Sequence, residues 1–251
     1  MKLKTKCFQL CLALSLGLTA LPTQATVDLK EYGFNVDGTY TSNAAPPGVN
    51  LGAFDTGSGL GTITATITGI GAHFFGGFFD HELSQGINTP FNETGFAVGT
   101  AAAGQSWEID EPGFGICPSN NCPPDPFDYQ GDIFVNINDS DPTINYLDNL
   151  IFYDWFANQT YTPPDDVSMA MGWLFDLLVD EIARITLVIS TDVNDMIGSL
   201  YLEQRDVDTG EQLFLSGSLN ISTVAVPEPS MLLLLALGQL ALLGILRARQ
   251  V

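Results

Sequence analysis

The chain has 251 residues, of which 29 are acidic and 8 basic, so its formal net charge is −21 at pH 7. A chain this acidic repels phosphate backbones and anionic lipid headgroups, which excludes nucleic acid as a partner and disfavours docking on an anionic bilayer. Hydrophobic residues make up 45% of the sequence and aromatic residues 10%, enough to bury a core, so the composition also excludes a disordered protein.

Residues 1–25 are typical of a secretory signal peptide. Three lysines precede an apolar run from Leu10 to Leu21, and small residues precede a cleavage position that we place before Thr26. A permanent N-terminal anchor is the alternative, but the apolar run is short for a membrane span. We therefore expect export, with residues 26–224 as one domain. Residues 26–225 hold 28 acids (29 less Glu228) and 3 bases, a net charge of −25.

The first half of this domain contains candidate strands at residues 34–40 and 61–68. In the second stretch, Ile63, Ala65 and Ile67 alternate with four threonines, which predicts a strand with one solvated face. A proline-rich loop is expected between the two strands, at residues 43–48.

Residues 73–82 place four phenylalanines around Gly76-Gly77, and we interpret them as a glycine-rich aromatic hairpin with its polar residues at the surface. If the glycine pair forms the turn, His73 and His81 could meet, with Asp80 and Glu82, in a metal or acid–base cluster. On one extended strand the two histidines would instead be about 27 Å apart. Two histidines alone rarely define a metal site.

The second half contains further strand patterns. Residues 132–135 are a candidate strand, residues 118–126 a loop, and residues 145–157 a region where a short helix could form. Alternation from Val167 to Leu177 predicts a long strand with its aromatic side toward the core, with a helix as the alternative over residues 173–179. Strands are also expected at 184–190, 200–207 and 212–221, the last two joined by a hairpin turn at 208–211. This pattern predicts an all-β fold, an antiparallel β-sandwich or jelly roll.

Cys7 and Cys11 would leave with the signal peptide, whereas Cys117 and Cys122 stay in the exported domain. A pair five positions apart in an exported protein favours a loop disulfide, which would stabilise the fold by roughly 2 kcal/mol. A redox motif would need a shorter Cys-x-x-Cys spacing, and a zinc site would need more soft ligands.

Clustered acids suggest two kinds of chemistry. Glu108, Asp110 and Glu111 could supply the two carboxylates of a glycosidase, but in a chain with 29 acids such pairs arise by chance. No nucleophile–histidine–acid pattern or nucleotide fingerprint is present in the sequence. We therefore predict no catalytic residues and no organic cofactor.

Calcium binding is a better interpretation of the clustered acids than glycosidase catalysis, because hard oxygen ligands at alternate positions of turns suit Ca²⁺. Neither candidate stretch matches a complete EF-hand loop, and solvated turn residues are an equally good interpretation. The candidate ligands are Asn136, Asn138, Asp139, Asp141, Asp206 and Asp208.

The C-terminus carries the most specific pattern in the sequence. Pro227, Glu228 and Pro229 precede an apolar stretch from Met231 to Leu246, which Arg247 and Arg249 follow. As a helix this stretch would span about 24 Å, less than the roughly 30 Å of a bilayer core. It would cross only with stretched flanks or a locally thinned bilayer, with the arginines on the cytoplasmic side.

These residues resemble the PEP-CTERM sorting signal of Gram-negative bacteria, here covering residues 225–251. The resemblance implies processing by exosortase, a membrane-embedded cysteine peptidase that removes the tail, after an intermediate stage in the inner membrane. A permanent single-span anchor is the alternative. Residues 73–82 and 104–113 are also similar to mature regions of other exosortase-type substrates, a group with no assigned activity.

The resemblance further implies an association with exopolysaccharide and biofilm formation. We therefore expect a non-enzymatic protein of the cell surface or extracellular matrix, with exopolysaccharide or matrix proteins as partners. The alternatives are a secreted carbohydrate-active enzyme and a carbohydrate-binding module. A module would need an exposed aromatic side chain, and the tryptophans to inspect are Trp107, Trp155 and Trp173, of which the alternation places Trp173 in the core.

Overall fold

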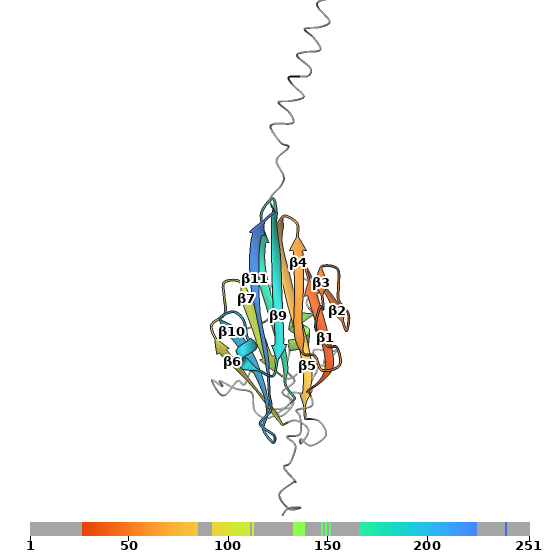
Figure 1. Cartoon of the computed structure of the whole chain (residues 1–251), viewed down its shortest axis with the longest axis vertical. Helices are drawn as coiled ribbons and strands as arrows, with labels where there is room; N and C mark the ends of the chain where they lie inside the picture. The colour runs from red at the N-terminus through yellow and green to blue at the C-terminus, as the bar shows by residue number, and fades with distance from the viewer. Residues whose placement is uncertain are drawn as a thin grey trace, which may run out of the picture.

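The computed structural model describes residues 27–84, 92–110, 112, 133–138, 147, 149, 151, 166–224 and 239. Its strands pair antiparallel and form two sheets that pack face to face (Figure 1). This confirms the predicted all-β sandwich.

The first sheet has five strands in the order β2-β1-β5-β8-β7. These strands are β1 (Val27–Val36), β2 (Thr39–Ser42), β5 (Gly71–Leu83), β7 (Gln105–Asp110) and β8 (Ser168–Leu177). The second sheet has six strands in the order β3-β4-β9-β11-β10-β6. They are β3 (Val49–Asn50), β4 (Gly61–Thr68), β6 (Glu93–Gly99), β9 (Glu181–Ser190), β10 (Leu200–Asp206) and β11 (Gln212–Thr223). The helix α2 (Ile133–Ile137) and the single 3₁₀ turn η1 (Val193–Asp195) complete the described elements.

The strands predicted from strict alternation are confirmed. β4 occupies residues 61–68, and its three alternating apolar side chains are buried while Thr64, Thr66 and Thr68 are exposed. β8 carries the alternation that begins at Val167, and it continues as a strand through Trp173 rather than as a helix. β10 and β11 pair across the predicted 208–211 turn. In β4, one buried and one solvated face gives the burial pattern a clear period of two.

Three predicted elements differ from the structure. Residues 73–82 are not a hairpin, because β5 runs without interruption through Gly76-Gly77. The predicted strand at 34–40 is split by a turn at Asp37-Gly38, where both residues have positive φ, between β1 and β2. Residues 133–135 of the predicted 132–135 strand belong to α2, because an apolar run this short fits a helix as well as a strand.

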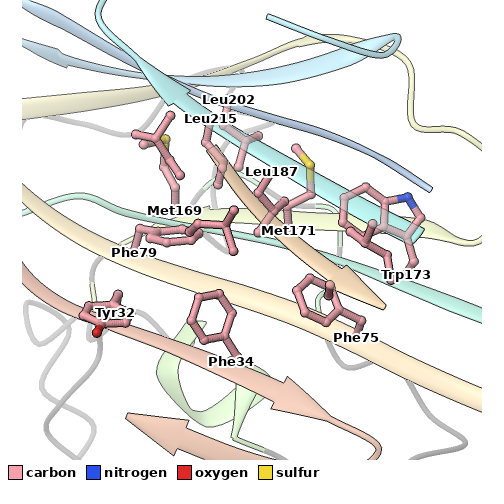
Figure 2. Close-up of a cluster of buried hydrophobic side chains, with 14 of the residues drawn as sticks. Tyr32, Phe34, Phe75, Phe79, Met169, Met171, Trp173, Leu187, Leu202 and Leu215 are labelled. Atoms are coloured by element: carbon pink, nitrogen blue, oxygen red, sulfur yellow. The ribbon is translucent and has the colours of Figure 1, made fainter. Parts of the chain in front are cut away.

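The core lies between the two sheets and is built from the inward-facing side chains of both (Figure 2). Phe34, Phe75 and Phe79 come from β1 and β5, and Trp173 comes from β8 with its indole against Phe75, ring centroids 6.5 Å apart. Leu187, Leu202 and Leu215 face them from the six-stranded sheet. The packing of large rings from one sheet against aliphatic side chains of the other is the main apolar burial of the fold.

A second, smaller apolar cluster covers the outer face of the five-stranded sheet. Phe74 and Phe78 of β5 point away from the main core and pack with Ile133 and Ile137 of α2 and with Leu147. Gly76 makes this close approach feasible, because a Cβ there would be 2.4 Å from Cδ1 of Ile137. The middle of this sheet is therefore buried on both faces.

Gly217 of β11 provides the matching close approach inside the sandwich. A Cβ at this position would be 2.6 Å from the indole of Trp173, 2.8 Å from Leu187 and 2.9 Å from the backbone oxygen of Thr186. We predict that Gly217→Ala lowers the free energy of unfolding by about 1–3 kcal/mol, because the crowded core cannot shift a backbone oxygen cheaply. Equilibrium urea unfolding measures this, with Ser218→Ala, the half-buried neighbour, as the control; equal midpoints for the two variants would contradict it.

Candidate functional site

A polar cluster fills the end of the sandwich where β5, β6 and β10 meet. The side-chain carboxyl group of Glu93 accepts hydrogen bonds from the backbone N–H groups of Leu83 (2.9 Å), in β5, and of Val167 (3.4 Å), the residue before β8. The amide Nε2 of Gln204 donates to the same carboxylate and also to the backbone oxygen of His81 (2.7 Å). Glu93 and Gln204 stand on neighbouring strands of the six-stranded sheet, so these bonds connect the two sheets.

Burial controls the ionisation of this inter-sheet polar cluster, which we define as His81, Glu93, Gln204 and Asp206. Desolvation raises the pKa of Glu93 to about 8, against the lowering effect of its two strongest donors, Leu83 N–H and Gln204. Desolvation also lowers the pKa of His81 to about 4, so this ring is neutral at neutral pH. Four buried polar atoms in the cluster have no hydrogen-bond partner among the described residues: both ring nitrogens of His81, Oε1 of Gln204 and Oδ2 of Asp206.

A second buried carboxyl, Asp80, lies on the outer face of β5. Its cross-strand neighbours are Glu31 on β1 and Ser168 on β8. Desolvation raises the pKa of Asp80 to about 8, and the negative charges of Asp166, Glu82 and Glu31 add to the shift, while Lys30 opposes it. At neutral pH the side chain of Asp80 is therefore mainly protonated and uncharged, and several other acids lie near it.

Two of the three carboxylates that could serve a glycosidase, Glu108 and Asp110, are buried on the same outer face. Glu108 and Asp110 alternate along β7, both nearly inaccessible. The amide of Asn136 on α2 donates to both oxygens of Glu108, at 3.2 and 3.1 Å. A glycosidase needs two carboxylates that face a substrate-sized cleft. In this structure α2 occupies the space over Glu108, while Glu111 lies outside the described residues.

The two histidines are placed far apart, and the prediction that this segment exposes its polar residues is wrong. His73 and His81 stand eight positions apart on one extended strand, and both, like Asp80, are buried. Nδ1 of His73 lies 3.0 Å from Oδ2 of Asp37, and Nε2 lies 3.2 Å from the backbone oxygen of Gly69. The His73–Asp37 contact joins the β1–β2 turn to the start of β5.

The predicted calcium ligands that the structure describes lie in two separate places. Asn136 and Asn138 belong to α2 and the residue that follows it, on the outer side of the five-stranded sheet. Asp206 ends β10, and its Oδ1 accepts a hydrogen bond from the N–H of Thr209 (2.7 Å), which shapes the turn that also contains Asp208. Among the described residues, no three His, Cys, Asp or Glu side chains are grouped as metal ligands would be.

A shallow pocket lies at one end of the six-stranded sheet, between the start of β4 and the end of β9. Its volume is about 380 Å³, and its lining includes Leu60, Thr62, Ser190, Thr191 and Asp195. Asp195 is the single carboxylate, and there is no aromatic ring, among the described residues that line it. Of the tryptophans, Trp173 is in the core as predicted, and Trp107 is partly buried against the core. Neither presents a flat exposed ring of the kind that stacks on sugars.

Several predicted site residues lie outside the described residues. They are the signal peptide, Trp155, the disulfide pair Cys117 and Cys122, the calcium candidates Asp139 and Asp141, and the sorting residues Pro227, Glu228, Pro229, Arg247 and Arg249. No helix within the described ranges has the length and apolar composition needed to cross a membrane.

Comparison with known families identifies one region of the chain. The family model for the PEP-CTERM protein-sorting motif matches residues 225–250. This chain therefore carries a PEP-CTERM sorting motif, which confirms the predicted resemblance and supports an exported protein that is sorted by exosortase. Searches of curated proteins and of solved structures returned no significant match. The match begins two residues after β11 ends, so the motif follows directly on the folded body.

The buried carboxyls predict that stability falls as the pH rises. Because the pKa values of Asp80 and Glu93 are raised on folding, the folded state binds more protons than the unfolded state between about pH 4 and pH 8. The contribution of these two groups to stability is therefore greatest near pH 4 and decreases up to about pH 8, by about 1.36 kcal/mol for each unit by which a pKa is raised.

Asp80→Asn keeps the shape of the side chain and removes its titration, so we expect a smaller fall in melting temperature between pH 5 and pH 8 than in the wild type. Asp176→Asn, at an exposed position on β8, removes the same charge and is the control. A decline as steep in Asp80→Asn as in the control would show that Asp80 does not titrate in this range.

Calcium binding stays a prediction. If the candidate turns bind the ion, a chelator at about 5 mM should lower the melting temperature markedly, because removing a ligand of the folded state destabilises it. An unchanged melting temperature, measured with Mg²⁺ present in both samples, would show that the prediction of calcium binding is wrong.

Proposed function

We propose that this protein is a non-enzymatic component of the extracellular matrix, released from the membrane of a Gram-negative bacterium by exosortase. The observation that carries the proposal is the sorting motif at residues 225–250, placed immediately after the last strand of a folded β-sandwich. In this proposal residues 1–25 are the signal peptide that starts export. The apolar stretch from Met231 to Leu246 then holds the chain in the inner membrane until the tail is removed.

The placement of the titratable groups supports a role without catalysis. Catalytic acids and bases need shifted pKa values and also access to a substrate. Asp80 and Glu93 have the shifted pKa values, but both side chains are almost fully buried. The pocket at β4 and β9 is open to solvent but offers one carboxylate among its described lining residues. Neither Asp80 nor Glu93 is among the described residues that line this pocket.

The resemblance to exosortase substrates points to exopolysaccharide or other matrix proteins as partners. The net charge of −25 over residues 26–225 adds a physical condition, since it disfavours direct contact with strongly anionic polymers at low salt. Neutral or cationic polysaccharides, and anionic ones bridged by divalent cations, fit this surface. The same charge would keep the released protein soluble at high concentration.

The sorting proposal is tested by intact-mass analysis of the extracellular protein from an exosortase-positive host. We predict a mass below the 27.0 kDa of the full chain, with both termini removed. The double variant Pro227→Ala/Glu228→Ala should remain at its full tail length in the membrane fraction, because the peptidase no longer recognises it. Pro47→Ala, in an exposed loop, is the matched control. An intact tail on the extracellular wild-type protein, or normal processing of the double variant, would contradict the proposal.

A further inference from the structure

The end of the sandwich from which the C-terminal tail departs carries an unusual set of exposed apolar side chains. Ile70 is 72% exposed, Leu178 68% and Val179 64%. Turns at protein surfaces are normally built from Gly, Pro, Asn, Asp and Ser, because their tips are solvated. Eight large hydrophobic side chains are well exposed among the described residues, and five of them lie at this end: Ile70, Leu178, Val179, Ile221 and Val224.

Two adjacent connections between the sheets form this apolar end. Residues 69–70 lead from β4 to β5, and residues 178–180 lead from β8 to β9. The connections are neighbours, because Gly71 pairs with Leu177 in one sheet and Thr68 pairs with Ile182 in the other. The N–H of Val224 donates to the oxygen of Asp180 (2.6 Å), which brings the end of the folded chain to the same place.

The backbone geometry keeps Ile70, Leu178 and Val179 exposed at the tips of these two connections; we call these three residues the apolar tips. Ile70 stands between Gly69 and Gly71, whose φ values of +121° and +120° are accessible to glycine and strained for other residues. In the other connection the N–H of Leu178 is bound by the carboxylate of Glu181 (2.8 Å), and Asp180 takes a positive φ of 63°. These bonds close a tight turn with Leu178 and Val179 at its tip. The exposure is thus part of the turn geometry.

The length of chain after the last described strand limits what can face these tips. Six residues, 225–230, separate Val224 from the apolar stretch that begins at Met231. Fully extended, they reach about 20 Å, since one residue spans at most about 3.4 Å. The 12 residues of β11 alone extend about 40 Å. A body tethered through this segment therefore keeps the apolar end close to the bilayer, while its opposite end stays distant.

We infer that Ile70, Leu178 and Val179 dock into the headgroup boundary of the membrane while the tail still anchors the chain; this inference rests on the proposed function. Tethering makes weak insertion sufficient, because the bilayer is present at a high effective concentration. Asp176, Asp180 and Glu181 flank the tips, so the surface favours zwitterionic over anionic lipid. Docking orients the body upright on the membrane and holds the sorting motif at the surface, and tail removal releases it.

The experiment uses the full chain reconstituted in phosphatidylcholine vesicles that carry a nitroxide quencher near the headgroup end of the acyl chain. A fluorescent amino acid replaces Val179 in one sample and Thr209, in the turn at the opposite end, in the other. We expect quenching at position 179 to exceed that at position 209 by about twofold or more, because interfacial insertion brings apolar groups to within several ångströms of the acyl chains. Replacing half the lipid with phosphatidylglycerol at low salt should weaken the quenching at position 179.

The variant Ile70→Ser/Leu178→Ser, with the probe at position 179, should lose most of the quenching. Val193→Ser/Val207→Ser removes two exposed valines elsewhere and should keep it. Equal quenching at positions 179 and 209 in vesicle-bound protein would overturn the inference and leave the sorting proposal intact. Failure of the full chain to float with the vesicles would overturn both. An unquenched probe at position 179 together with a dimer that Ile70→Ser/Leu178→Ser dissociates would assign the tips to a second copy of the chain instead.

Discussion

The pairing of β5 with β8 is the contact on which the rest of the structure depends, because it is the part of the fold that is buried on both faces. Toward the inside, Phe75, Phe79 and Trp173 pack on the aliphatic side chains of the six-stranded sheet. Toward the outside, Phe74 and Phe78 need a cover, which α2 and Leu147 provide. Burying both faces of a central strand pair supplies more apolar contact per residue than a strand with one wet face. It also commits the chain to a third layer.

Two acids on the outer face of the five-stranded sheet are buried. A carboxyl on the outer face of a sandwich sheet would ordinarily be solvated and charged. Asp80 and Glu108 lie instead on a face that is covered, and they are almost fully buried. Asp80 responds by a raised pKa, whereas Glu108 is matched by the amide of Asn136. The helix α2, which completes the apolar cluster, therefore also covers Glu108.

Strands with one solvated face are predicted well from the sequence. β4 and β9 alternate cleanly, since every second side chain meets water. β5 does not alternate, because both of its faces are buried, and its Gly76-Gly77 pair suggests a turn when the real reason is the close approach of Ile137 and Leu187. Burial on both faces is a property of the packed layers, and it leaves no period in the sequence of one strand.

The inter-sheet polar cluster around Glu93 could not be predicted from the sequence either. Glu93, Gln204 and His81 come from three strands, and only the register of β6 on β10 and the packing of β5 against both bring them together. With 29 acids in the chain, the composition does not mark the few that are buried. The C-terminal motif is the opposite case, because Pro227, Glu228, Pro229 and the apolar segment carry their information in linear order and need no folding to be recognised.

The two ends of the sandwich differ in the side chains that they carry. At one end Glu93 and Gln204 connect the sheets through hydrogen bonds to buried backbone groups of Leu83, Val167 and His81. At the other end the β4–β5 and β8–β9 connections cross between the sheets. The tips of these connections carry exposed apolar side chains. The end of β11 lies beside them, immediately before the sorting motif. In the tethered orientation inferred above, the pH-sensitive end would face away from the membrane, so a change of external pH would reach the brace between the sheets before and after release alike.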